Sequence, residues 1–270
     1  MNIENKILTW FEKDEKNRSL LKWFNNDNQN QELLKLYNSK KEMIKEIEAL
    51  NNELGYGKLS LLLSSIPPNY QKSKYKIMVI GQELNGGYGI KSEPKITMLD
   101  NLKSQTSKSS GNNFFSFPAR FCHTVNKLGD KLNKKEIRSY FIWAEIRKFS
   151  YWKPVRKPAV NKKPNASLNN KVQQLIYAKF NILEDEIRII NPDIVLFLIG
   201  PKSKYLESIC NQLKGVKFKK IDNWKERELV KVEHPILKGR KAFRLYHPGY
   251  LKRKGLENKY LEELVKQCSL

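Results

Sequence analysis

The sequence is poor in the residues that build metal centres and disulfide frameworks. It holds three Cys and three His in 270 residues, and Cys122, Cys210 and Cys268 lie far apart without a C-x-x-C pair. Zinc knuckles and iron–sulfur clusters need several such ligands at short spacings, so both kinds of site are excluded. Scattered Cys in odd number suit a reducing compartment, and we expect a cytoplasmic protein without a metal.

Long apolar runs are missing as well. No stretch approaches the roughly 20 apolar residues that span a bilayer. Residues 1–6 also lack the apolar core of a secretory signal peptide. We therefore expect no membrane as a partner.

Acidic residues are scarce relative to basic ones. The chain has 51 Lys and Arg against 28 Asp and Glu, a formal net charge of +23. A positive field of this size fits a polyanion, and nucleic acid is the best match. A Lys-rich coding bias is the alternative, because Lys, Asn and Ile are all abundant, but bias alone should raise Glu along with Lys.

Hydrophobic periodicity predicts an N-terminal helical segment followed by an α/β region. Apolar residues recur at helical spacing through residues 1–65. Short runs rich in strand-forming residues follow at 76–80, 140–144, 193–199 and 244–246. We expect helices at 114–128, 172–191, 203–213 and 256–266, and loops at 91–113 and 150–170. The pattern predicts a three-layer α/β/α fold with a short, mostly parallel sheet, divided into residues 1–70 and 71–270.

Polar residues follow three of the expected strands, and active sites of such folds lie at the carboxyl ends of strands. The segments are 79–86 (Val-Ile-Gly-Gln-Glu-Leu-Asn-Gly), 141–148 (Phe-Ile-Trp-Ala-Glu-Ile-Arg-Lys) and 246–251 (Tyr-His-Pro-Gly-Tyr-Leu). In this order they resemble the uracil-DNA glycosylase superfamily over residues 75–265. The first is similar to its water-activating Gly-Gln-Asp-Pro motif, the second to the strand that ends in the base-reading Asn, and the third to its His-Pro-Ser motif.

The resemblance implies hydrolysis of the N-glycosidic bond of a flipped-out DNA base by a monomer without an organic cofactor. This cleavage gives a sugar with oxocarbenium character and an anionic leaving base. A carboxylate that orients water and offsets the positive charge is needed near the sugar, and Glu83 stands at that motif position. His247 matches the His that stabilises the leaving base, and Gln82 matches a residue that hydrogen-bonds it.

A flipped base needs aromatic rings to stack on and a side chain that inserts into the duplex. The candidates for stacking are Phe114, Phe115 and Phe117, and those for insertion are Tyr250 and Leu251. The candidates for holding phosphates are Lys252, Arg253 and Lys254. We also expect the polar residues 91–113 to form a mobile loop that faces nucleic acid, either duplex or single-stranded DNA.

Three positions depart from the family pattern and change the expected base. Glu83 replaces an Asp, and Asn85 replaces the Tyr that crowds out a C5 substituent in the best-known branch. Glu145 replaces the base-reading Asn. An ionised carboxylate only accepts hydrogen bonds, so it suits the exocyclic amine of cytosine better than uracil O4. We therefore predict a cytosine-type base, enlarged at C5, as in superfamily members that excise glucosylated hydroxymethylcytosine in phage defence; DNA repair is the other context.

Other interpretations remain open. Replacement of both the Asp and the Asn would also be found in a catalytically inactive DNA-binding or sensor module. An endonuclease is a weaker alternative, because no Asp, Glu and His cluster is spaced for paired metals. In purely structural roles, Glu145 would pair with Arg147 or Lys148, His247 would be a satisfied structural His, Glu83 would be a solvated loop carboxylate, and the three Phe would belong to the core.

Overall fold

The computed structural model of the protein describes residues 3–55, 59–83, 93–106, 113–129, 132–151 and 170–268. Within these ranges six side chains are not described: Ile3, Glu83, Asn113, Lys134, Lys135 and Tyr151. The predicted loop at 150–170 therefore lies almost wholly outside the described residues, and Asn85 lies outside them too.

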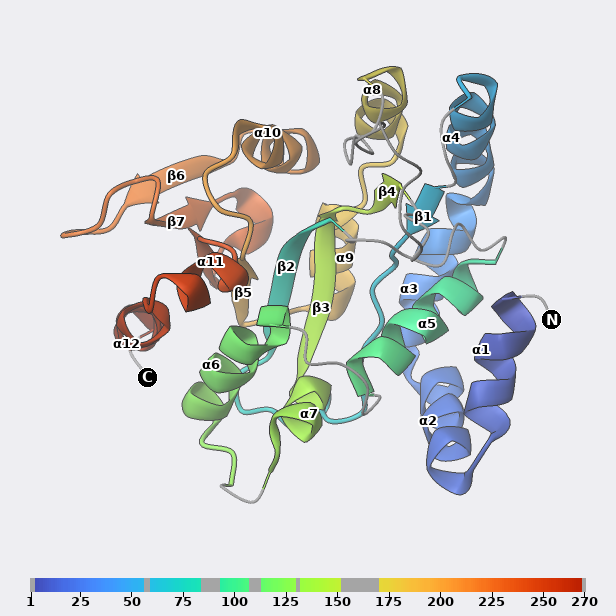
Figure 1. Cartoon of the computed structure of the whole chain (residues 1–270), viewed down its shortest axis with the longest axis horizontal. Helices are drawn as coiled ribbons and strands as arrows, with labels where there is room; N and C mark the ends of the chain where they lie inside the picture. Colours follow the sequence, from blue (N-terminus) through green and yellow to red (C-terminus); the bar gives the residue numbers. More distant parts are fainter. Residues whose placement is uncertain are drawn as a thin grey trace, which may run out of the picture.

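A six-stranded sheet forms the middle of the molecule, in the order β3-β2-β5-β8-β7-β6 (Figure 1). The strands are β2 (Ile77–Glu83), β3 (Phe141–Arg147), β5 (Ile194–Phe197), β6 (Lys217–Lys220), β7 (Leu229–Glu233) and β8 (Lys241–Leu245). β3, β2, β5 and β8 run parallel, whereas β7 and β6 form an antiparallel hairpin at one edge. The predicted α/β fold with a mostly parallel sheet is confirmed.

The parallel strands are apolar because helices cover both faces of the sheet. Side chains alternate between the two faces. Met78 and Ile80 point into one core, and Ile77 and Val79 into the other; all four are fully buried. This double burial explains why residues 77–80 form a continuous apolar run instead of alternating with polar residues.

The N-terminal helices pack against the first of these cores. They are α1 (Ile3–Glu12), α2 (Glu15–Asn26), α3 (Asn28–Ser39) and α4 (Lys41–Glu53). Asp14 and Asp27 cap α2 and α3 by accepting hydrogen bonds of 2.8 Å from the backbone N–H of Asn17 and Asn30. The helical prediction holds through Glu53, but Leu59–Leu61 form strand β1, which pairs antiparallel with β4 (Phe149–Tyr151).

Two buried polar contacts join these helices to the rest of the molecule. The side chain of Asn30 donates to the backbone oxygen of Ile66 at 3.0 Å and accepts from its N–H at 2.9 Å. Tyr37 donates to Glu186 Oε1 at 2.6 Å, while Lys148 Nζ lies 2.7 Å from Glu186 Oε2. Buried polar groups are costly unless paired, so these contacts fix how the N-terminal helices dock.

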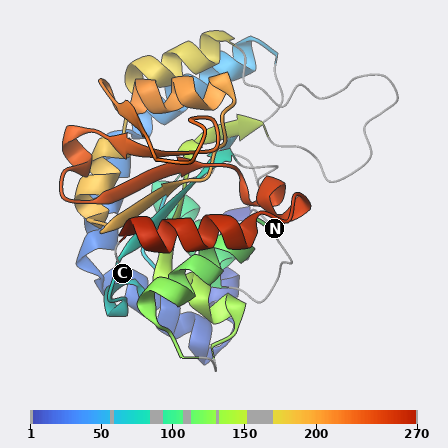
Figure 2. The same cartoon turned by 90° about the vertical axis from the view of Figure 1, so that its left-hand side faces the viewer.

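The remaining helices complete the two layers. α8 (Asn170–Lys179), α9 (Leu183–Ile190) and α10 (Ser203–Gln212) pack into the first core, as does α5 (Pro94–Thr106). α6 (Ser116–Asn126), α11 (Pro248–Arg253) and α12 (Glu257–Cys268) pack into the second core, and the short α7 (Lys134–Ile137) contacts α6. Figure 2 shows α12, in red, lying along α6, in green.

The mobile loop predicted at 91–113 is wrong for residues 94–106, which form α5. Two of its polar residues, Asn101 and Gln105, are buried and make hydrogen bonds inside the protein. Asn101 donates to the backbone oxygen of Leu63 at 2.8 Å, and Gln105 donates to Asn101 Oδ1 at 2.9 Å. Polar composition suggested a solvated loop, but these side chains make intramolecular hydrogen bonds instead of contacting water.

Two further expectations need correction. The single helix predicted at 172–191 is interrupted at residues 180–182, where Gln212 Oε1 accepts from the backbone N–H of Ile182 and Leu183, each at 3.3 Å. The hairpin of β6 and β7 was not predicted at all. Its outer strand carries three exposed Lys and therefore lacks the apolar pattern of a strand.

Candidate functional site

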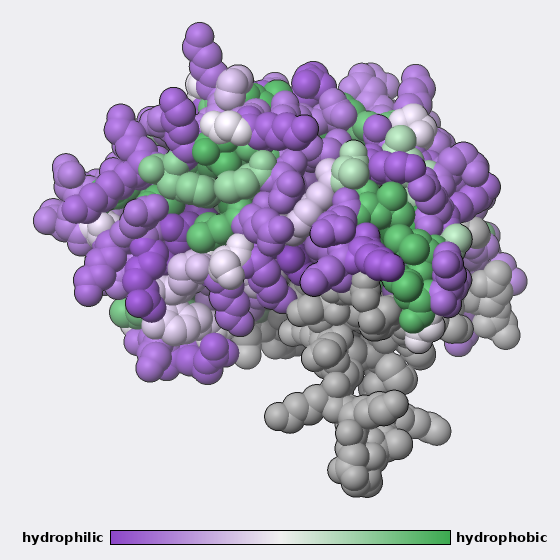
Figure 3. All heavy atoms as spheres, turned by 90° about the horizontal axis from the view of Figure 1, so that it is seen from above, coloured by the Kyte–Doolittle hydropathy of each residue, from purple (hydrophilic) through white to green (hydrophobic). Residues whose placement is uncertain are grey.

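Four parallel strands end at the same edge of the sheet, at the top of Figure 1. Three of the segments chosen from the sequence lie there: Gly81 to Glu83 at the end of β2, Glu145 near the end of β3, and His247 directly after β8. Figure 3 views this end from above, where mainly hydrophilic side chains surround smaller apolar patches. The structure thus brings the three segments to one edge.

Gly81 and Glu145 lie opposite each other in the β2–β3 register. A Cβ atom on Gly81 would lie 2.9 Å from Cδ and Oε1 of Glu145 and still closer to Oε2. The carboxylate therefore rests directly on the backbone of Gly81, and only glycine permits this approach. Glu145 is 4% exposed, which places a carboxylate in a largely desolvated position.

Trp143 holds this carboxylate in place. Its indole Nε1 donates to Glu145 Oε1 at 2.9 Å. The two residues are two apart on β3 and therefore share one face of the sheet. The sequence analysis did not select Trp143, although its spacing from Glu145 in a predicted strand was a usable signal.

A chain of ring contacts leads from Trp143 to His247. The ring centroid of Phe114 lies 6.2 Å from that of Trp143 and 5.4 Å from that of His247. Phe115 meets Trp143 edge to face at 5.0 Å. Glu145 and His247, which come from different strands, are thus linked through aromatic side chains at one site.

His247 is held as a neutral imidazole in one tautomer. Burial lowers the pKa of His247 below its usual value, and the positive charges of Arg253 and Lys202 lower it further. Its Nδ1 accepts a hydrogen bond from the backbone N–H of Gly249 at 3.1 Å, at the start of α11. The proton of the neutral ring is therefore on Nε2, which makes this atom a hydrogen-bond donor.

Gln82 faces the other side of the sheet. Its Nε2 donates to the backbone oxygen of Ile199 at 2.7 Å, which ties the end of β2 to the segment after β5. The side-chain nitrogen is engaged within the protein, so the base contact expected of Gln82 would fall to its backbone. The backbone of Glu83 ends β2 opposite Arg147, while its side chain lies outside the described part of the structure.

Two of the expected contact residues need correction. Phe117 and Leu251 are fully buried in the second core, so neither can stack on a base or insert into DNA in this conformation. Phe115 is also buried, with the Arg138 guanidinium 4.3 Å from its ring centroid. The ring of Tyr250 is half-buried and lies 4.4 Å from that of Tyr246.

The three expected phosphate-binding residues, Lys252, Arg253 and Lys254, are exposed at the end of α11. Of the two proposed pairing partners of Glu145, Lys148 is bound to Glu186. Arg147 donates to Ser208 Oγ at 3.0 Å and to the backbone oxygen of Lys204 at 3.2 Å.

The buried thiols are unsuited to nucleophilic chemistry. Burial raises the pKa of Cys122 to about 12 and that of Cys268 to about 11, so both stay protonated at neutral pH. Among the described residues, no group of three or more His, Cys, Asp and Glu is arranged to hold a metal ion. No helix in the described ranges is both long and apolar enough to cross a membrane.

Comparison with known proteins identifies no relative of the chain: no protein-family model matches it, and no curated protein has a significantly similar sequence.

Proposed function

We propose that this protein is a DNA glycosylase, which hydrolyses the N-glycosidic bond of a flipped-out base and leaves an abasic site. The observation that carries the proposal is the contact chain from Glu145 through Trp143 and Phe114 to His247, at the strand edge where Glu83 ends β2. It combines a buried hydrogen-bond acceptor, aromatic rings and a neutral imidazole at the strand edge where the backbone of Glu83 ends β2.

Each group has a role in this reaction. Water attacks the anomeric carbon, the C–N bond breaks, and its electron pair leaves with the base. The carboxylate of Glu83 orients the water, accepts the proton that the water releases and offsets the positive charge on the sugar. The Nε2–H of His247 donates a hydrogen bond to the base as negative charge develops on it, and the released base anion then takes up a proton from solvent.

The expected base follows from the environment of Glu145. Trp143 donates to one carboxylate oxygen, which fixes the orientation of the group. A carboxylate so fixed accepts from the exocyclic amine of a cytosine-type base, whereas uracil O4 offers it no donor. We therefore propose a cytosine-type base, modified at C5, as the substrate, in phage defence or DNA repair.

The test is a panel of labelled duplexes carrying uracil, cytosine, C5-modified cytosines and mismatches. Abasic sites would be detected by alkaline strand cleavage, with EDTA present to silence metal-dependent nucleases. We expect product from a cytosine-type base, and a rate about 10²- to 10³-fold lower for Glu83→Gln. The exposed Glu93→Gln is the matched control and should act like the wild type. Absence of abasic product on every base, with DNA binding retained, would favour the inactive sensor module instead.

A second variant tests how the base is recognised. Glu145→Gln keeps the side-chain length but adds a donor, so its amide can donate to uracil O4 and accept from N3–H. We expect its relative preference for uracil over the cytosine-type base to rise at least about tenfold, because buried unpaired polar groups strongly disfavour the wrong base. An unchanged ratio would contradict the role of Glu145.

A further inference from the structure

The connection between β6 and β7, residues 221–228, lies at the same edge of the sheet as the candidate site. β7 is antiparallel to β8, with Leu229 opposite Leu245, and β6 ends at Lys220 opposite Val230. The loop therefore ends beside the carboxyl end of β8, two residues before His247, and begins one strand further away, at the end of β6. Helix α12 is also in contact with it.

Contacts between side chains join this loop to the candidate site. Arg227 Nε donates to the hydroxyl of Tyr246 at 3.2 Å, and the Tyr246 ring contacts the tilted ring of Tyr250 of α11, with 4.4 Å between centroids. On the other side, the Trp224 ring meets Tyr260 of α12 edge to face, at 4.6 Å between centroids. Lys259 Nζ lies 4.7 Å from the centroid of the same Trp224 ring.

A buried cation anchors the loop from below. Arg244 on β8 is 2% exposed. It donates to the backbone oxygen of Arg227 at 2.9 Å and to that of Glu226. Both hydrogen bonds go to backbone carbonyl groups of the loop, so the loop backbone is fixed before any ligand binds, and the Glu226 carboxylate of the same loop also acts on the charge of Arg244.

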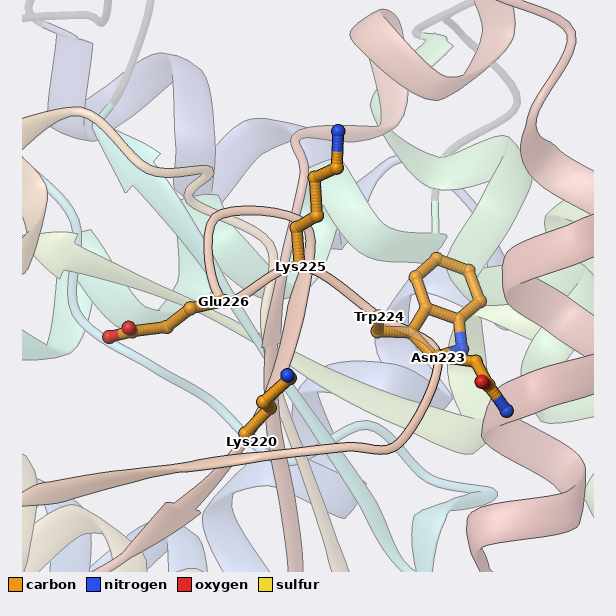
Figure 4. A pocket seen from close by; sticks show the side chains of 5 residues that line it. All are labelled: Lys220, Asn223, Trp224, Lys225 and Glu226. Atoms are coloured by element: carbon orange, nitrogen blue, oxygen red, sulfur yellow. The ribbon is translucent and has the colours of Figure 1, made fainter.

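The surface of the loop is hollowed, and two Lys side chains lie at the hollow (Figure 4). A hollow of about 510 Å³ is lined by Lys220, Asn223, Trp224, Lys225 and Glu226. The side chains of Lys220 and Lys225 are exposed, and Glu226 is directed away from the Trp224 side. Residues 220–228 contain three basic and three acidic residues, whereas the whole hairpin, residues 214–231, contains seven basic and three acidic, so the excess of positive charge comes from the residues that flank the loop.

We propose that residues 220–228, with Lys259 beside them, form a DNA-backbone-binding surface that holds the strand flanking the flipped base. This inference rests on the proposed function for its choice of DNA as the polyanion. Exposed Lys and Arg around a preformed hollow bind phosphates independently of sequence. The surface continues to the exposed basic residues of α11 through the Arg227, Tyr246 and Tyr250 contacts, which gives the backbone a path to the site.

The structural alternative is that Lys on the edge strand β6 only prevents edge-to-edge aggregation. Charge reversal distinguishes protection of the edge strand from phosphate binding. A Glu side chain also prevents edge-to-edge pairing of strands, but it repels phosphates. The test variant is Lys220→Glu with Lys225→Glu. Its matched control is Lys214→Glu with Lys238→Glu, two exposed Lys near the opposite end of the hairpin, which change the net charge equally.

Binding would be measured by fluorescence anisotropy with a labelled DNA duplex of about 20 base pairs and no target base, between about 50 and 200 mM salt. We expect the test variant to bind at least about tenfold more weakly and to lose about 2 from the slope of log K against log salt. The control should change Kd by less than about threefold, since its charges act only at long range.

The proposed DNA-binding surface would be contradicted if both double variants bound DNA equally weakly. It would also be contradicted if the test variant bound DNA like the wild type. If the test variant lost binding to an RNA duplex but bound the DNA duplex like the wild type, DNA would be ruled out as the partner of this surface. Base excision is read separately, and the control variant, Lys214→Glu with Lys238→Glu, should keep the wild-type rate. If no base is ever excised, the proposed function fails while the binding comparison still decides the surface.

Discussion

Residues 1–70 and residues 71–270 differ sharply in charge. The first region has ten basic and ten acidic residues, and the second has 41 basic and 18 acidic. The whole surplus of +23 therefore lies in the second region. A coding bias toward Lys would affect both regions alike, so this contrast favours a functional origin of the charge, and electrostatic attraction of a polyanion is the effect expected of it.

The two regions also use polar groups differently. The N-terminal helices meet the α/β region through a shared apolar core and a buried hydrogen bond from Tyr37 to Glu186 of α9. The α/β region instead brings polar and aromatic groups to the strand edge, among them Glu145 and His247. The first region thus acts as a covering layer for one face of the sheet, and the second carries the candidate site.

The largest expected effect concerns the buried ion pair beneath Tyr37. Lys148 and Glu186 have side chains 2% and 0% exposed. Lys148→Met would leave the Glu186 carboxylate buried with its cation removed, and we expect the free energy of unfolding to fall by about 3–5 kcal/mol. Urea denaturation followed by circular dichroism measures this.

The control is a surface ion pair that joins the two regions, whereas both members of the buried pair lie in residues 71–270. Lys179 of α8 and Glu46 of α4 lie 2.6 Å apart but are about half exposed. Lys179→Met should cost less than about 1 kcal/mol, since solvent screens such pairs. Similar losses in both variants would show that burial does not distinguish the two contacts.

The next effect concerns the approach of Glu145 to β2. Gly81→Ala would place a methyl group against the Glu145 carboxylate, so we expect a loss of about 1–3 kcal/mol in stability from overpacking. Base recognition should also weaken, because the carboxylate must move. Thermal unfolding and the abasic-site assay measure the two consequences.

Gly129→Ala is the matched control, because nothing lies within 4 Å of a Cβ added at Gly129. It should leave stability within about 1 kcal/mol and excision unchanged. If Gly81→Ala behaved in the same way, the close contact between the two strands would have no functional importance.

The smallest effect is a pH dependence confined to the second region, which holds all three His of the chain. The pKa of His247 is lowered in the folded protein, so the unfolded chain takes up a proton first as pH falls. The contribution of His247 to the free energy of unfolding is fully present above about pH 6.5. It is lost as pH falls from that value to the lower pKa of the folded protein, by at most about 1.4 kcal/mol per pH unit. Urea denaturation at pH 7.5 and 5.5 measures the loss, and His247→Asn should reduce it. An equal loss in the variant would assign it to other groups.

Local periodicity predicted much of the fold. The helical spacing of residues 1–53 and the apolar runs at 76–80 and 193–199 report directly on burial, because a side chain's face follows from its position in a helix or strand. It failed where polar residues were used internally, as in α5, and where charge masked a strand, as in β6. In both cases the partner groups lie far away in the sequence.

The candidate site was only partly predictable. The polar residues after the strands identified Gly81, Glu145 and His247, since the carboxyl ends of parallel strands meet at one edge. Trp143 escaped because its role depends on a hydrogen bond to a neighbour on the same face. Phe117 and Leu251 were misassigned because an apolar side chain in a motif gives no sign of whether it points outward or into the core.

The sequence by itself determined the α/β class, the excess of positive charge and the carboxylates and imidazole at the strand ends. These depend on composition and short-range spacing alone. Only the tertiary structure decided that the Glu145 carboxylate rests on Gly81, that His247 is held neutral as a donor, and that a hollow lined by Lys220 and Lys225 lies at the same edge of the sheet. Each of these depends on burial and on contacts between residues distant in the chain, which no local pattern encodes.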